Sequence, residues 1–219
     1  MRNTIEEIFE KDSSVLPYFI KLKYGIRIKP KNEKLTFLQP TRFSSWKGSQ
    51  LSLECMTELF EGGYDFSFIH GGCNNLLYGS LKIPSFAKKW VDSGNIRLES
   101  YSFEEINQQL KEADIILSPT VGSEQFGEPF SLVCLEAMLL EKPIIASDSG
   151  FIPLLLQNYS RTQIVKAGSK EKLLEAIRKW VEEPLPELRE NDKVIIQAWK
   201  QKIETSPKVH IQFYEQFKG

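Results

Sequence analysis

Residues 114–147, DIILSPTVGSEQFGEPFSLVCLEAMLLEKPIIAS, decide the fold class of this chain. An apolar run of strand length stands at each end of the stretch, and the near-continuous apolar run between them predicts a helix from Pro129 or Phe130 to Leu140. Because parallel strands need a crossover connection, usually a helix, this order is typical of a βαβ unit with buried parallel strands.

The same alternation extends over most of the chain. Ser102 and Glu105 have the spacing of a capping box, which predicts a helix start. The pattern predicts an α/β domain over residues 35–219, a Rossmann-like parallel sheet with helices on both faces, preceded by a linker or helical extension over residues 1–34. The further strands are expected at 35–38, 64–69 (running into a turn at Gly71-Gly72), 96–98 and 163–165, and the further helices at 50–60, 85–91, 103–112, 151–156, 169–181 and 191–217.

The composition is that of a soluble globular protein. With 28 basic and 29 acidic residues, the chain lacks the strong positive field that nucleic-acid binding needs, so we expect no nucleic-acid partner. Cys55, Cys73 and Cys134 have no ligand-like spacing to the two histidines, which favours structural thiols in a reducing compartment and no metal site. The chain shows neither a membrane-span pattern nor a signal-peptide pattern. We therefore expect a cytoplasmic protein, with a peripheral position at the inner face of a membrane left open.

The loop from Ser118 to Pro129 is the first place to look for a site, because ligands of parallel α/β sheets bind beyond the carboxyl ends of the strands. It leads into a helix N-terminus, where free N–H groups and the positive end of the dipole suit a phosphate. Glu128 stands at the mouth of this helix, and Glu136 lies about two turns further on, at ~3.6 residues per turn, among apolar neighbours. A buried carboxylate is costly without partners. The residues alone support a structural ion pair for Glu136 and a ligand-binding role equally.

Two stretches, GEPFSLVCLEAM (127–138) and KPIIASDSGFIP (142–153), carry a family resemblance. They closely resemble the donor-site signature of retaining GT-B glycosyltransferases, the group 1 or family 4-like class that includes sucrose synthase-like and mannosyltransferase-like enzymes. The resemblance implies that the chain is the C-terminal, donor-binding half of a GT-B fold. It also implies that Glu128 contacts the donor sugar and Glu136 the ribose hydroxyls. The donor-binding residues expected between the two glutamates are Pro129, Phe130, Ser131 and Leu132.

A second element, TRFSSWKG (41–48), follows the first predicted strand. It resembles the family's Arg and Lys pair that grips the donor diphosphate, which assigns this role to Arg42 and Lys47. Two cations on one strand-to-helix loop can close on a diphosphate from different sides, and the Arg fork matches phosphate oxygens. A weaker resemblance places Tyr101 near the nucleotide base. The sequence departs from the family pattern at Thr41, where a glycine usually precedes the arginine.

His70 ends a predicted strand beside two glycines and is the tempting candidate for a catalytic base. We expect a local hydrogen-bonding role instead, because the histidine that the family uses on the acceptor side belongs to the other domain. The four tryptophans are spread over different predicted elements, which favours packing or rim positions over a stacking platform.

The resemblance implies metal-independent transfer of a hexose, with retention, from a nucleoside diphosphate sugar to a glycan, lipid-linked or protein acceptor, as in polysaccharide biosynthesis. Arg42, Lys47 and Glu128 are the expected catalytic residues, with the two cations stabilising charge on the leaving diphosphate. No cofactor is expected. Residues 1–34 are too few for the acceptor-binding N-terminal domain of such enzymes, so we expect a separate acceptor-binding domain or chain as partner. A non-catalytic nucleotide-sugar-binding module, a subunit of a split enzyme, and an epimerase or hydrolase on the same fold stay open.

Overall fold

The computed structural model describes residues 34–77, 79, 81–122, 127–128 and 130–216. The predicted N-terminal extension lies almost entirely outside this range and stays a prediction. Among the described residues no helix is long and apolar enough to cross a membrane.

The described strands form one six-stranded parallel sheet with the order β3-β2-β1-β4-β5-β6. This confirms the predicted Rossmann-like sheet. The chain begins at the middle of the sheet, builds outward to β3, and then returns to the other side of β1 to form β4. The gap between β1 and β4 is therefore the topological switch point, where open α/β sheets bind their ligands. The strands are β1 (Thr36–Arg42), β2 (Ser67–Gly72), β3 (Ile96–Leu98), β4 (Ile115–Ser118), β5 (Ile144–Ser147) and β6 (Thr162–Val165).

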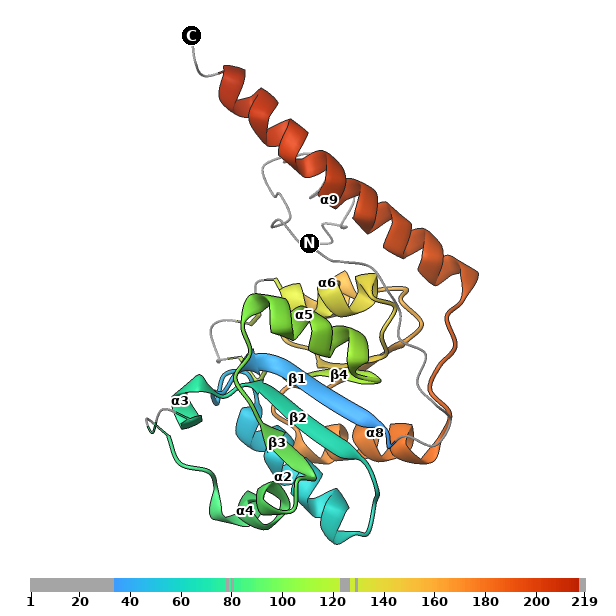
Figure 1. Cartoon of the computed structure of the whole chain (residues 1–219). Helices are drawn as coiled ribbons and strands as arrows, with labels where there is room; N and C mark the ends of the chain where they lie inside the picture. Colours follow the sequence, from blue (N-terminus) through green and yellow to red (C-terminus); the bar gives the residue numbers. More distant parts are fainter. Residues whose placement is uncertain (1–33, 78, 80, 123–126, 129, 217–219) are drawn as a thin grey trace.

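Helices cover both faces of the sheet (Figure 1). Helices α2, α4 and α8 pack on one face, and α5, α6, α7 and the beginning of α9 pack on the other. The remainder of α9 extends away from the sheet (Figure 1). The helices are α2 (Ser49–Glu61), α3 (Asn74–Leu77), α4 (Ser85–Asp92), α5 (Phe103–Glu112), α6 (Leu132–Leu139), α7 (Ile152–Leu155), α8 (Lys170–Glu182) and α9 (Glu190–Gln216).

Successive strand residues supply two separate cores. Phe37 and Ile115 belong to the core under α2 and α8, whereas their chain neighbours Leu38 and Ile116 belong to the core under α6. Because side chains alternate across a strand, a sheet that is covered on both faces needs apolar residues at consecutive positions. The unbroken apolar runs of the sequence reflect this demand.

The predicted ends of the first two strands are wrong. Strand β1 continues past Leu38 to Arg42, and Gly71-Gly72 belong to β2 instead of forming a turn. Arg42 pairs with Gly72 after an irregularity in the register that begins at Gln39. A Cβ at Gly72 would collide with the carbonyl oxygen of Thr41, so only glycine lets the two strands approach here.

The predicted start of the helix in the deciding stretch is also wrong. Helix α6 begins at Leu132, because Ser131 is its N-cap and its hydroxyl accepts a hydrogen bond of 3.3 Å from the backbone N–H of Cys134. The predicted capping box at Ser102 and Glu105 is present at the start of α5. Helix α3 was not predicted, and the C-terminal helical segments form one helix, α9.

Gly48 allows a close approach of the β1–α2 loop to the end of β4. Its φ is 71°, and a Cβ there would collide with the carbonyl oxygen of Pro119. Gly63 has a similar φ of 84° but nothing lies within 4 Å of a Cβ there, so it is a matched control for backbone strain alone.

We expect Gly48→Ala to lower the free energy of unfolding by about 3 kcal/mol or more, because it adds a backbone collision to the strain of a positive φ, and Gly63→Ala to lower it by about 1 kcal/mol. Urea unfolding followed by circular dichroism measures both. Equal losses would show that the loop does not press on Pro119.

Candidate functional site

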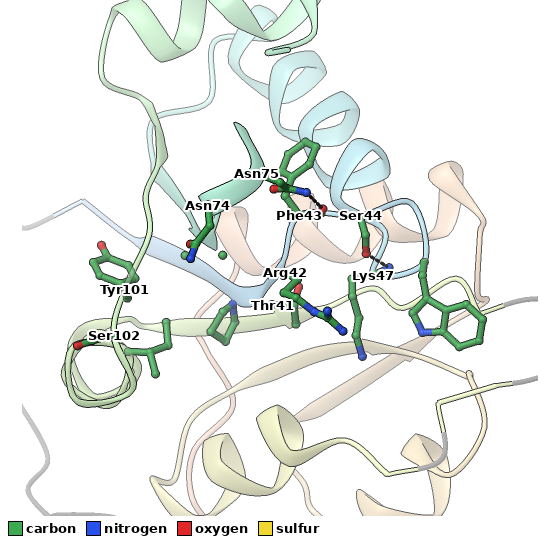
Figure 2. A pocket seen from close by; sticks show the side chains of 14 residues that line it. Thr41, Arg42, Phe43, Ser44, Lys47, Asn74, Asn75, Tyr101 and Ser102 are labelled. Carbon is green, nitrogen blue, oxygen red and sulfur yellow. Dashed lines mark hydrogen bonds between the residues drawn. The ribbon is translucent and has the colours of Figure 1, made fainter. Parts of the chain in front are cut away.

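A pocket of about 850 Å³ opens at the carboxyl ends of β1 and β2, next to the switch point (Figure 2). Its volume is in the range of small-molecule sites. The residues that line it come from β1 and the following loop, the end of β2, α3 and the start of α5: Pro40, Thr41, Arg42, Phe43, Ser44, Trp46, Lys47, Gly71, Gly72, Asn74, Asn75, Tyr101, Ser102 and Ile106.

Arg42 and Lys47 lie next to each other at one side of this pocket and point the same way (Figure 2). Arg42 is exposed, and within the described ranges no carboxylate forms an ion pair with it. The side chain of Lys47 is 24% exposed. One cation at the end of β1 and one in the loop that follows it are suited to an anion with several oxygens, and the diphosphate expected from the sequence stays a prediction.

The backbone of Lys47 is held from two sides. The fully buried side chain of Gln39 donates from Nε2 to the carbonyl oxygen of Lys47 at 2.9 Å and to the hydroxyl of Thr41 at 3.2 Å. Ser44 accepts from the N–H of Lys47 at 3.3 Å. Gln39 is not among the residues predicted from the sequence, because a glutamine followed by a proline does not resemble a buried strand position. The loop is therefore set rigidly before any ligand binds.

His70 supports the same loop through a chain of two hydrogen bonds. It is fully buried in β2, and its Nε2 lies 2.9 Å from the hydroxyl of Ser49, which in turn accepts from the backbone N–H of Ser44 at 3.0 Å. Burial lowers the pKa of His70 to about 3, so the ring stays neutral at physiological pH. His70 does not line the pocket. Its contacts agree with the predicted hydrogen-bonding role.

Glu128, in the loop before α6, contacts the Lys47 side of the pocket. Its carboxylate lies 2.5 Å from Nζ of Lys47, and its side chain is 9% exposed. Its backbone N–H donates to Ser149 at 3.2 Å and its carbonyl accepts from Phe151 at 2.9 Å. Residues far apart in sequence thus fix the carboxylate beside the pocket.

The residues between the two glutamates have structural contacts where the structure describes them. Phe130 is half-buried and packs near Phe151 and Trp199, with ring centroids 5.8 and 6.4 Å away. Ser131 caps α6 with its hydroxyl, and Leu132 is half-buried on that helix. Pro129 lies outside the described residues. None of the three described residues lines the pocket, so their donor contacts stay predictions.

Glu136 is a half-buried residue on α6. Within the part of the chain that the structure describes, no hydrogen bond or ion pair involves its side chain, so the structural ion pair that the sequence left open is not observed there. Burial raises the pKa of Glu136 from its ordinary 4.5 to about 7. A carboxyl that is desolvated but unpaired costs stability, which is typical of a residue kept for a ligand.

Tyr101 lines the pocket at the side away from Lys47 (Figure 2), and its hydroxyl donates to the carboxylate of Glu99. Asn75 lines it from α3 and donates to the carbonyl oxygen of Phe43 at 2.8 Å. The sequence analysis did not single out Asn75, since its signal, an asparagine shortly after a strand end, is weak. The pocket thus unites Arg42, Lys47 and Tyr101.

The model of the family described as glycosyl transferases group 1 matches residues 26–201. The chain belongs to this family. A comparison of the sequence with curated proteins gives no significant match.

Solved structures of GT-B glycosyltransferases share the fold of this chain at low identity. A glycosyltransferase from Rickettsia africae matches with a TM-score of 0.62 and 20% identity over 85% of this chain and 48% of its own. Alr3699/HepE from Anabaena, solved with UDP-glucose, matches with 0.58 and 17% over 85% and 49%. The C-terminal domain of a group 1 protein (LpcC) from Francisella tularensis matches with 0.54 and 16% over 78% and 85%. The chain spans about half the length of the first two and most of the isolated C-terminal domain.

The three cysteines of this glycosyl transferase family member are free and buried. Burial raises the pKa of Cys55 and of Cys73 to about 12, which keeps both as neutral thiols. In the described ranges no three His, Cys, Asp or Glu side chains gather as a metal site would need.

We expect the variant Glu136→Gln to be more stable than the wild type above neutral pH. The folded chain holds a proton on Glu136 up to about pH 7 while the unfolded chain releases it near 4.5, so the free energy of unfolding falls as the pH rises through this window, by up to ~3 kcal/mol. Glutamine carries no such penalty. Urea unfolding at pH 5 and pH 8 measures the difference, which should grow with pH.

The exposed Glu183 provides the control, because Glu183→Gln should change the free energy of unfolding little at either pH. A Glu136→Gln variant that is less stable than the wild type at both pH values would contradict the prediction, since that result requires a structural partner for the carboxylate.

Proposed function

We propose that this chain binds a nucleoside diphosphate sugar and takes part in the transfer of its hexose, with retention, to a glycan, lipid-linked or protein acceptor. The observation that carries the proposal is the joint placement of Arg42, Lys47 and Glu128 at the switch point: two cations beside a pocket, one of them paired to a carboxylate. Membership of the glycosyl transferase family supports the reaction class.

Arg42 and Lys47 would hold the donor diphosphate. A diphosphate presents oxygens on two linked phosphorus atoms, and a guanidinium fork beside an ammonium matches them better than either cation alone. As the bond between sugar and diphosphate breaks, negative charge accumulates on the leaving group. Arg42 is held in β1 and the backbone of Lys47 is held by Gln39 and Ser44, so the stabilisation costs little reorganisation.

Lys47 also places the sugar. Because the sugar is bonded to the second phosphate, a cation that contacts this phosphate lies next to the sugar as well. The carboxylate of Glu128 is 2.5 Å from this cation, so it would lie within reach of the sugar hydroxyls or the reacting carbon. We therefore assign Glu128 to the donor sugar, as the family resemblance implies.

Glu136 would accept hydrogen bonds from the ribose hydroxyls. An ionised carboxylate has lone pairs for two hydroxyl donors, and it has no partner among the described residues. Two such hydrogen bonds would offset the cost of its burial. Tyr101 lies on the opposite side of the pocket from Lys47, in a place suited to the base (Figure 2).

The acceptor half of the reaction needs residues outside the described domain. The chain covers 48% of the glycosyltransferase from Rickettsia africae but 85% of the isolated C-terminal domain from Francisella tularensis. We propose that a separate acceptor-binding domain, on the same polypeptide or on another, completes the enzyme, and that no metal or cofactor is required. A non-catalytic nucleotide-sugar-binding module is the alternative.

We expect isothermal titration calorimetry with UDP, GDP and ADP, and with their common sugar conjugates, to show selective binding of one nucleotide. Arg42→Ala should weaken this binding by roughly 10- to 100-fold, because it removes a charge-assisted contact. Glu136→Ala should weaken binding of the nucleoside diphosphate and of the free nucleoside alike. Arg178→Ala, on the exposed face of α8, is the matched control and should bind as the wild type does.

Binding of none of the nucleotides, by a chain that melts cooperatively, would contradict the proposal. Selective binding without any transfer, under every pairing with candidate acceptor domains, would instead support the binding-module alternative.

We expect loss of both cations, in Arg42→Ala with Lys47→Met, to abolish transfer from the labelled donor once an acceptor domain is supplied in trans. Because removing the lysine alone would leave a buried unpaired carboxylate, both changes are made together with Glu128→Gln, and the loss that counts is the loss relative to Glu128→Gln alone. Transfer that persists without both cations would show that the mechanism is wrong. The anomeric configuration of the product, by proton NMR, tests retention.

A further inference from the structure

Three of the six exposed large apolar side chains in the described ranges lie in one segment. Leu81, Ile83 and Phe86 expose 44%, 42% and 39% of their surface just before and at the start of α4. Within the described ranges, the other three exposed large apolar side chains are scattered over separate elements: Val121, Ile164 and Val194, the last being the most exposed of all six at 66%. A single exposed apolar side chain needs no explanation, whereas three in six residues indicate a contact surface.

Lysines accompany these three side chains. Lys82, Lys88 and Lys89 are all exposed, and Asp92 is the one acidic residue between positions 81 and 92. We call residues 81–89 the apolar-basic segment. The combination decides the kind of partner, because the cores of protein–protein interfaces are depleted in lysine, whereas segments that bind membrane surfaces carry lysines next to large apolar side chains.

The opposite face of α4 packs against the rest of the domain. Ala87 is fully buried, and Trp90 lies against Phe60 with ring centroids 5.1 Å apart. These contacts fix the helix on the sheet without any help from Ile83 or Phe86. The exposed apolar side chains are therefore not required for packing within the domain, and they need another reason to be there.

The apolar-basic segment is anchored beside the donor pocket. The backbone N–H of Leu81 donates to the carbonyl oxygen of Asn75 at 2.9 Å, and Asn75 itself lines the pocket from α3. Helices α3 and α4 lie on the other side of the domain from the part of α9 that extends away from the sheet (Figure 1). A surface that contacts this segment would thus meet the domain near the mouth of the pocket.

We propose that residues 81–89 dock the protein on a membrane surface rich in anionic phospholipid. Lys82, Lys88 and Lys89 bind the phosphate headgroups, while Leu81, Ile83 and Phe86 enter the boundary between headgroups and acyl chains. The attraction between each lysine and the anionic surface is screened by salt, so the docking is reversible. The proposal goes beyond glycosyl transfer and stands without it, because it rests on a different surface.

The test is sedimentation of the full chain with vesicles of phosphatidylglycerol and phosphatidylcholine in equal parts, at low and at high salt. The wild type should bind these vesicles, bind poorly to pure phosphatidylcholine, and release at high salt. Ile83→Ser with Phe86→Ser, and separately Lys88→Gln with Lys89→Gln, should each lower the partition coefficient roughly 10-fold or more.

Matched control variants remove two exposed apolar side chains, or two exposed charges, at positions outside the apolar-basic segment. Ile164→Ser with Val194→Ser removes two exposed apolar side chains, and Arg178→Gln with Lys179→Gln removes two exposed charges. Both controls should bind vesicles as the wild type does. The lysine variant keeps the test decisive if the apolar variant fails to fold, which its melting curve would show.

Three results would overturn the proposal: no binding of the wild type to anionic vesicles, equal losses in the controls, or unchanged binding in both segment variants. A wild type that ignores vesicles but self-associates in analytical ultracentrifugation, with dissociation in the Ile83→Ser, Phe86→Ser variant, would assign the segment to a second copy of the chain instead. Nucleotide calorimetry on the same samples separates these failures from failure of donor binding.

Discussion

The ion pair between Lys47 and Glu128 joins two loops that are 81 positions apart in sequence, and the candidate site depends on it. Its two side chains are 24% and 9% exposed, so each charge has lost most of its water and neither can stay there without the other. Such a pair contributes little net stability, but it specifies geometry. It fixes the loop after β1 against the loop before α6, across the switch point of the sheet.

The ion pair can form because the backbone segments on either side of it lie very close to each other at two glycines. A Cβ at Gly48 would strike Pro119, and a Cβ at Gly150 would strike the backbone of Glu128, where φ is 56° for the glycine. These glycines let the ends of β1, β4 and β5 converge. The hydrogen bond from Val121 N–H to the carbonyl oxygen of Trp46, at 2.9 Å, then closes the junction. The site is thus formed by the loops that follow β1, β4 and β5, which approach one another at Gly48 and at Gly150.

Local patterns in the sequence predict the sheet and most helices, because burial on both faces of a parallel sheet leaves apolar runs and the Ser102 capping box is a local signal. They fail at the end of β1, where Gln39, Thr41 and Arg42 look like a loop. Those residues are strand because they pair with β2, where Gln39 lies beside His70 and Arg42 beside Gly72, and the local sequence does not show this pairing. The role of Gln39 was not predicted, because Thr41 and Lys47, to which its side chain donates, were themselves expected in a loop. His70 was predicted as a hydrogen-bonding residue, but its partner Ser49 was not. The glutamates and cations were found through the resemblance, since spacing alone left Glu136 undecided.

Glu136 shows how the fold and the site conflict. Helix α6 buries Cys134, Leu135, Ala137 and Met138 and leaves its less buried face to Glu136 and its neighbours. An apolar or amide side chain at that position would suit the fold better, because burial raises the pKa of the carboxyl to about 7 and no partner among the described residues compensates. Local choices that work against the fold gather at functional sites. The proposed ribose contact is consistent with this conflict, because two ribose hydroxyls would bring the hydrogen-bond donors that the described residues do not supply.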